Sequence, residues 1–191
     1  VYGPVFGLLL APFATMAKSQ GQVLWTVLQL LAMVALLVLP SKMIRRLWPP
    51  AFYVYAATLT LSFPLLHNLK WGQVSSLMVL TVLGALLALE REWQIVSGGV
   101  LALGVAVKFY TLPFALPLAL HGGRRWLLAF CVAGVVFAGV VPVVAFGAGQ
   151  TLAAYEHVAE QIKARKKRSY INRNSQSVGA IAHRWLPVRA R

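Results

Sequence analysis

The chain has 191 residues, 59% of them hydrophobic, and its apolar residues lie in long uninterrupted blocks. That composition excludes an ordinary soluble domain and predicts an all-α protein whose helices cross a lipid bilayer, because a backbone inside lipid must satisfy its own hydrogen bonds. The net charge of +14 comes from 18 Lys and Arg against four acidic residues, all glutamates, so an Asp-containing triad and a DxD-type metal site are excluded.

The first half of the chain predicts three crossings. Residues 1–16 are apolar but short, and Pro4 and Pro12 interrupt them, so we expect either a loop that enters a helix or the end of a segment whose beginning lies upstream. The stretches expected to cross the bilayer in succession are residues 21–39, 52–66 and 74–89. The basic cluster at 42–46 follows the first crossing in an expected loop, and the positive-inside rule places that loop in the cytoplasm. The polar segment 67–73 is then exoplasmic.

Residues 95–120 allow two interpretations, because the block is long for one span and holds Lys108 near its middle. It is either one kinked crossing or a hairpin of two half-helices with Lys108 at the turn. Residues 126–146 form the next span. A kinked crossing would leave the basic C-terminal region in the cytoplasm, as the positive-inside rule prefers, whereas the hairpin would leave it outside.

The character of the chain changes after residue 147, which divides it into a transmembrane region, 1–147, and a surface region, 148–191. Within residues 150–163, Leu152, Tyr155 and Ile162 recur at helical spacing, which predicts an amphipathic helix on a membrane or protein surface. The basic run 163–168 could pair with anionic lipid headgroups, which is the default expectation, or with a lipid-linked phosphate. No recognised nucleic-acid-binding fold accompanies it, so membrane lipids rather than nucleic acid are the expected partner.

Three polar features could bind a ligand. Lys108 either marks a phosphate site or snorkels to an interface, because a cation inside an apolar block is costly. The Gln73 amide can bond sugar hydroxyls, although the segment also fits an interfacial Trp71 with a turn glycine. The segment Asn174–Ser177 can cap a helix whose N-terminus favours an anion, or be a plain cap. The scattered histidines and the lone Cys131 indicate no metal site, and we expect no cofactor.

In order, five short motifs resemble those of glycosyltransferase family 87 in the GT-C superfamily, typified by polyprenyl-phosphomannose-dependent mannosyltransferases. The motifs are Tyr2-Gly3-Pro4, Gly72-Gln73-Val74-Ser75, Lys108 ahead of Pro113, Arg124-Arg125, and Asn174-Ser175-Gln176-Ser177 followed by Arg184. The resemblance covers nearly the whole chain. Ser75 stands where the family has Asn, and Gly3 stands where it has the first Pro.

The resemblance implies a GT-C transmembrane bundle with an exoplasmic amphipathic helix, and it favours the hairpin. It implies transfer of a hexosyl, specifically mannosyl, group from a polyprenyl-phosphate-linked donor to a hydroxyl of a lipid or glycan acceptor at a bacterial or archaeal plasma membrane. The residues that it assigns to substrate binding are Gln73, Lys108, Asn174, Gln176, Ser177 and Arg184.

The resemblance also implies a catalytic aspartate in an exoplasmic loop, and this chain has none. We therefore expect the chain to be the C-terminal portion of such an enzyme, with its base upstream of Val1, and to be inactive alone. A transporter or lipid flippase fragment, or a non-catalytic membrane subunit, would also explain an intramembrane lysine and a broken helix.

Overall fold

The computed structural model describes residues 2–62 and 74–169, and most of these are helical, with no strand among them. The prediction of an all-α protein is confirmed. The helices are α1 (Pro4–Ala14), α2 (Lys18–Val38), α3 (Ser41–Leu47), α4 (Pro49–Leu61), α6 (Ser75–Glu90), α7 (Gln94–Val107), the 3-10 helix η1 (Phe109–Phe114), α8 (Ala115–Val135), the π-helix η2 (Val136–Val140), α9 (Val141–Phe146) and α10 (Ala148–Ser169).

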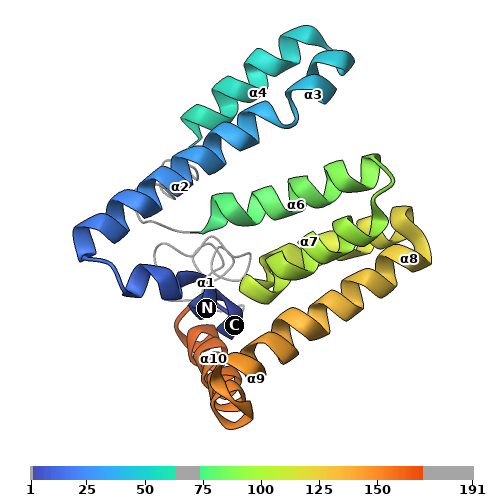
Figure 1. Cartoon of the computed structure of the whole chain (residues 1–191). Coiled ribbons are helices and arrows are strands. Elements are labelled where there is room, and N and C mark those ends of the chain that lie inside the picture. Colours follow the sequence, from blue (N-terminus) through green and yellow to red (C-terminus); the bar gives the residue numbers. More distant parts are fainter. Residues whose placement is uncertain (1, 63–73, 170–191) are drawn as a thin grey trace, which may run out of the picture.

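The core of the molecule is built from α6, α7 and α8, with α7 packed against both of the others (Figure 1). Its apolar centre consists of Val82, Ala85, Leu89, Leu101, Leu118 and Trp126. The helix α2 packs on α6 and leads into the α3–α4 pair, and the Tyr55 hydroxyl of α4 donates to the Leu36 carbonyl of α2 at 2.6 Å. This arrangement leaves α6 between the α2–α4 arm and the rest of the core.

A buried polar network ties the three core helices together at the N-terminal end of α7. The Ser97 hydroxyl donates to the Ala85 carbonyl at 2.7 Å, and the indole Nε1 of the fully buried Trp126 donates to Ser97 Oγ at 2.8 Å. A Cβ added at Gly98 would lie 2.8 Å from the Trp126 carbonyl oxygen and from the Phe130 nitrogen, which is too close for any side chain. A small residue at this position therefore lets α7 and α8 approach each other closely.

The chain reverses direction at Lys108 and again at Gly123. Lys108 is extended (φ −154°, ψ 119°) and ends α7. The chain then returns along α6, because Phe114 and His121 line the same cavity as Glu90 at the far end of α6. Gly123 has φ 67° and ψ −161°, a conformation that glycine adopts most readily, and the remainder of α8 runs back toward α9 (Figure 1). Residues 95–120 therefore form the hairpin with Lys108 at its turn, and the alternative of one kinked crossing is wrong.

Two helical stretches in the described part of the chain are long and apolar enough to cross a membrane, Lys18–Val38 and Phe109–Phe146. The second contains the reversal at Gly123, so its two parts run in opposite directions. The apolar helices Pro4–Ala14, Ser75–Glu90 and Gln94–Val107 are shorter. The predicted segments 21–39 and 74–89 agree with α2 and α6 to within a few residues, and 126–146 lies in α8, η2 and α9.

Three local predictions need correction. Residues 4–14 form a helix rather than an entering loop, because Pro4 occupies the first turn, where a missing N–H costs nothing. The basic cluster 42–46 lies within the short helix α3. The helix α4 starts at Pro49 and ends at Leu61, before the predicted end at residue 66, and Pro64 follows that end in the sequence. Residues 63–66 lie outside the described residues.

The predicted amphipathic helix corresponds to α10, but a different face packs against the protein. Leu152 and Ile162 are exposed, whereas Thr151 is buried and Tyr155 is half-buried. The Tyr155 hydroxyl donates to the Ala138 carbonyl of η2 at 2.5 Å. Burial raises the pKa of that hydroxyl, which keeps it protonated and able to donate.

Candidate functional site

Lys108 lies at the turn of the hairpin, and its side chain is 8% exposed. Its N–H donates to the Gly104 carbonyl at 2.9 Å, while its own carbonyl accepts from the Thr111 hydroxyl at 3.4 Å. The Nζ atom lies 4.7 Å from the ring centroid of Tyr110 and 5.2 Å from that of Tyr2, both within the range of a cation–π interaction. The turn thus holds a buried ammonium group between two aromatic rings.

The N-terminal segment is docked onto the end of α7 beside this lysine. The Gly3 N–H donates to the Val107 carbonyl at 3.1 Å. A Cβ at Gly3 would collide with the Ala106 carbonyl oxygen, so only glycine fits. The Tyr2 ring stacks on Phe6 with 4.5 Å between centroids. The structure therefore brings the Tyr2-Gly3-Pro4 motif into contact with the lysine of another motif.

An apolar cavity of about 440 Å³ adjoins Lys108 along α6. It is lined by Leu36, Pro40, Tyr55, Ser75, Met78, Val79, Val82, Leu83, Leu86, Lys108, Tyr110, Thr111 and Phe114. A further cavity of about 510 Å³ shares Leu83, Leu86 and Phe114 with it and reaches Glu90 and His121. The two together follow α6 from the lysine at one end to the α6–α7 turn at the other, and we name them the lysine groove.

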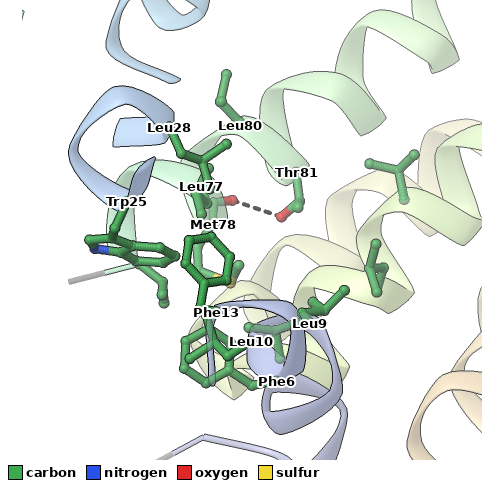
Figure 2. A pocket seen from close by; sticks show the side chains of 14 residues that line it. Phe6, Leu9, Leu10, Phe13, Trp25, Leu28, Leu77, Met78, Leu80 and Thr81 are labelled. Atoms are coloured by element: carbon green, nitrogen blue, oxygen red, sulfur yellow. Dashed lines mark hydrogen bonds between the residues drawn. The ribbon is translucent and has the colours of Figure 1, made fainter. Parts of the chain in front are cut away.

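A separate cavity of about 430 Å³ lies on another face of α6, among α1, α2 and α7 (Figure 2). Figure 2 shows Phe13 beside Trp25, whose rings meet edge to face with 5.9 Å between centroids. The Thr81 hydroxyl within it donates to the Met78 carbonyl at 2.8 Å. Met78 lines this cavity as well as the lysine groove. Among the described residues, those that line the cavity of Figure 2 are mainly aliphatic and aromatic, which suits it to apolar groups.

A buried hydrogen bond anchors the start of α6 to α2. The Ser76 hydroxyl donates to the Oε1 atom of Gln29, and both side chains are almost fully buried. Since a buried amide is costly unless it is hydrogen-bonded, this pair fixes the first turn of α6 against α2. The neighbouring Ser75 lines the lysine groove, so the pair also positions one wall of the site.

All four glutamates of the chain lie within the described residues, and all four are exposed. Glu90 and Glu92 lie at the α6–α7 turn, at the end of α6 opposite Lys108, and Glu156 and Glu160 lie on α10. None of them lines the part of the groove next to Lys108. Across residues 2–62 and 74–169, no group of three His, Cys, Asp or Glu side chains could hold a metal ion.

A comparison with protein families matches residues 1–190 to the model described as glycosyltransferase family 87. The chain belongs to glycosyltransferase family 87. No curated protein and no solved structure matches it. Membership of the family identifies the protein as a membrane glycosyltransferase, which acts on a sugar donor and an acceptor, and it favours this interpretation over the transporter, flippase and non-catalytic alternatives.

Lys108 is the one predicted substrate-binding residue of this family 87 protein that falls in the described part of the chain. Its burial beside a groove agrees with a ligand site, and its role in binding stays a prediction. The other predicted residues, which lie outside the described residues, are Gln73, Asn174, Gln176, Ser177 and Arg184.

The predicted substrate-binding residues did not include four that shape the candidate site: Tyr2, Tyr110, Gln29 and Ser76. Gln29 could have been found, because a lone amide within an apolar span needs a buried partner. The contact of Tyr2 with Lys108 had no local signal, since it depends on how the segment before α1 packs against the end of α7, about a hundred residues later in the sequence.

Proposed function

We propose that this family 87 glycosyltransferase transfers a hexosyl group, specifically mannosyl, from a polyprenyl-phosphate-linked donor to a hydroxyl of a lipid or glycan acceptor. The observation that carries the proposal is the buried Lys108 ammonium at one end of the apolar lysine groove. A lipid phosphate has a charged head and an apolar tail, and these two features match the two parts of the groove.

The dimensions of the groove support a lipid rather than a small soluble sugar. The helix α6 that lines it has 16 residues, which at about 1.5 Å per residue is about 24 Å, most of the thickness of a bilayer core. An isoprenoid tail lying along α6 would contact Val79, Leu83 and Leu86. Its phosphate would lie at Lys108, where a compact ammonium is a suitable partner for phosphate oxygen.

In the proposed reaction, the acceptor oxygen forms a bond to the anomeric carbon while the bond from that carbon to the phosphate oxygen breaks, with inversion. The lipid phosphate leaves with the bonding electron pair, and Lys108 stabilises the charge that develops on it. The acceptor proton passes to a carboxylate base. All four glutamates are exposed and none lines the part of the groove next to Lys108, so we place the base outside this chain and expect the chain alone to be inactive.

We propose that the Lys108 end of the multi-pass core faces the exoplasm of a bacterial or archaeal plasma membrane. The turns after α6 and at Gly123 carry Arg91 and Arg124-Arg125, and they lie at the opposite end, where the positive-inside rule expects the cytoplasm (Figure 1). In a Cys131→Ala background, Gln150→Cys should react with an impermeant thiol reagent from the exoplasmic side. Labelling from the cytoplasmic side alone would reverse this orientation.

Lys108→Met in the full-length membrane-embedded protein tests the role of the charge. Turnover with the polyprenyl-phosphate-linked donor should fall by about tenfold to a hundredfold, the range of a charge-assisted hydrogen bond. Lys108→Arg should restore part of the activity, because a planar guanidinium needs a different geometry. Amounts of folded protein are equalised by size-exclusion chromatography.

Lys18→Met is the matched control, because Lys18 is an exposed lysine at the start of α2 and lines none of these cavities. It should keep wild-type turnover. Wild-type turnover and donor affinity in Lys108→Met would remove Lys108 from the site and leave Gln73, Asn174 and Gln176 as candidates.

A further inference from the structure

Two tyrosines flank the Lys108 ammonium, and they come from distant parts of the chain. Tyr110 belongs to η1, two residues after the lysine, whereas Tyr2 precedes α1. A lysine side chain has a flexible four-carbon stem, so a single charged head can sample many positions unless neighbouring groups restrain it. The faces of two aromatic rings attract a cation and would limit that sampling.

Specific contacts fix the position of Tyr2. The Val107 carbonyl belongs to the last turn of α7, where carbonyls have no intrahelical partner, and the Gly3 N–H donates to it. The absence of a Cβ at Gly3 permits this approach to the Ala106 carbonyl. Tyr2 also stacks on Phe6, which packs against the buried cluster around Val107. These contacts hold the ring beside Lys108.

We propose that Tyr2 and Tyr110 are positioning residues, whose ring faces hold the Lys108 ammonium at the end of the lysine groove for the donor phosphate. This inference rests on the proposed role of Lys108. The rings rather than the hydroxyls perform the task, because the contact is between the ring and the cation. Phenylalanine should therefore replace either tyrosine, and an aliphatic residue should not.

A ring-fluorination series in the full-length protein separates this electrostatic role from simple packing. Phenylalanines with one, two or three ring fluorines, placed at position 110, keep nearly the same shape and progressively weaken the negative ring face. We expect Tyr110→Phe to keep the donor KM within about twofold. Each added fluorine should then raise that KM in steps, up to about tenfold, and should also lower kcat, because the same ammonium stabilises the departing phosphate.

The matched control is the same series at Tyr53, which is 73% exposed, as Tyr110 is, and packs on Phe52 away from Lys108. The donor KM should not respond there. In a Lys108→Met background the series at position 110 should also be flat, because the cation it acts on is gone. At the other ring, Tyr2→Phe should leave the donor KM within the range of unfluorinated phenylalanine at position 110. Tyr2→Leu should raise it as much as the trifluorinated ring does.

A readout without sugar distinguishes this inference from the proposed function. The rate at which an amine-reactive reagent acylates Lys108, followed by mass spectrometry, should rise severalfold along the fluorine series at position 110 as the ammonium is released. A rising acylation rate with an unchanged donor KM would keep the positioning role and overturn the donor-phosphate role. An acylation rate that does not respond to fluorination would overturn the positioning role.

Discussion

The two ends of α7 place polar groups in different surroundings. At the N-terminal end, the Ser97 hydroxyl donates to Ala85 and accepts from Trp126, so its hydrogen bonds join three helices. At the C-terminal end, Lys108 lies at a chain reversal beside a groove, between Tyr2 and Tyr110. A neutral hydroxyl with helix partners stabilises the core, whereas a cation held at a cavity is costly to maintain and indicates a ligand.

Glycine has a different role at each end of α7. Gly98 and Gly3 both lie where a Cβ would strike a backbone carbonyl of another segment. Gly98 permits close contact between α7 and α8 in the core, whereas Gly3 permits the N-terminal segment to reach the end of α7. Substitution at the first should therefore affect folding, and substitution at the second should affect the site.

The largest expected effect is that of Gly98→Ala. The added methyl group would meet the Trp126 carbonyl oxygen and the Phe130 nitrogen, both backbone atoms that cannot move without shifting α8. We expect a loss of about 3 kcal/mol in the free energy of unfolding, measured by thermal denaturation in detergent. The fraction that remains folded should bind donor normally, because Lys108 lies at the far end of α7.

Gly99→Ala is the control, since a Cβ at the adjacent Gly99 meets nothing within 4 Å. It should be neutral or slightly stabilising, as alanine is the better helix former. Equal stability of the two alanine variants would show that α7 and α8 are not packed as closely as described.

A smaller effect is expected for Gly3→Ala, and it should appear in activity rather than in stability. The segment that carries Tyr2 must shift away from the Ala106 carbonyl, which moves the ring off the lysine. We expect kcat/KM to fall by about tenfold, equivalent to about 1.4 kcal/mol. The melting temperature should change by no more than about 2 °C, because the segment lies outside the α6–α8 core.

Gly7→Ala provides the comparison for Gly3→Ala, because Gly7 lies in α1 and has open space around its Cβ position. Its activity should equal that of the wild type. A Gly3→Ala enzyme with unchanged kcat/KM would contradict the docking of the N-terminal segment as part of the site.

Much of the fold could be predicted from the sequence, because apolar length alone determines which segments form the helices α2 and α6. Apolar length could not distinguish a hairpin from one kinked crossing, since the hydropathy of residues 95–120 is the same in both. Extended backbone at Lys108 ends α7, and packing of the returning chain against α6 settles the direction. The prediction that Pro4 interrupts the first segment is wrong, because proline is favoured in the first turn of a helix and Pro4 begins α1.

The candidate site was less predictable than the fold. The place of Lys108 in an apolar block indicated that its side chain could be buried. It did not indicate the contact with Tyr2, because Tyr2 reaches Lys108 through long-range packing. The Gln29–Ser76 pair joins helices that are separated in the sequence by the α3–α4 pair. A single sequence indicates that each polar group needs a partner, but it does not identify the partner.

The central claim, that the Lys108 end of α7 binds a lipid phosphate, is tested most directly by equilibrium binding of polyprenyl phosphate and of the uncharged polyprenol to the purified full-length protein. The wild type should bind the phosphate at least about tenfold more tightly than the alcohol, and Lys18→Met should keep this preference. Lys108→Met should bind the two lipids about equally, because the groove still accepts the tail. A full preference for the phosphate in Lys108→Met would contradict the account.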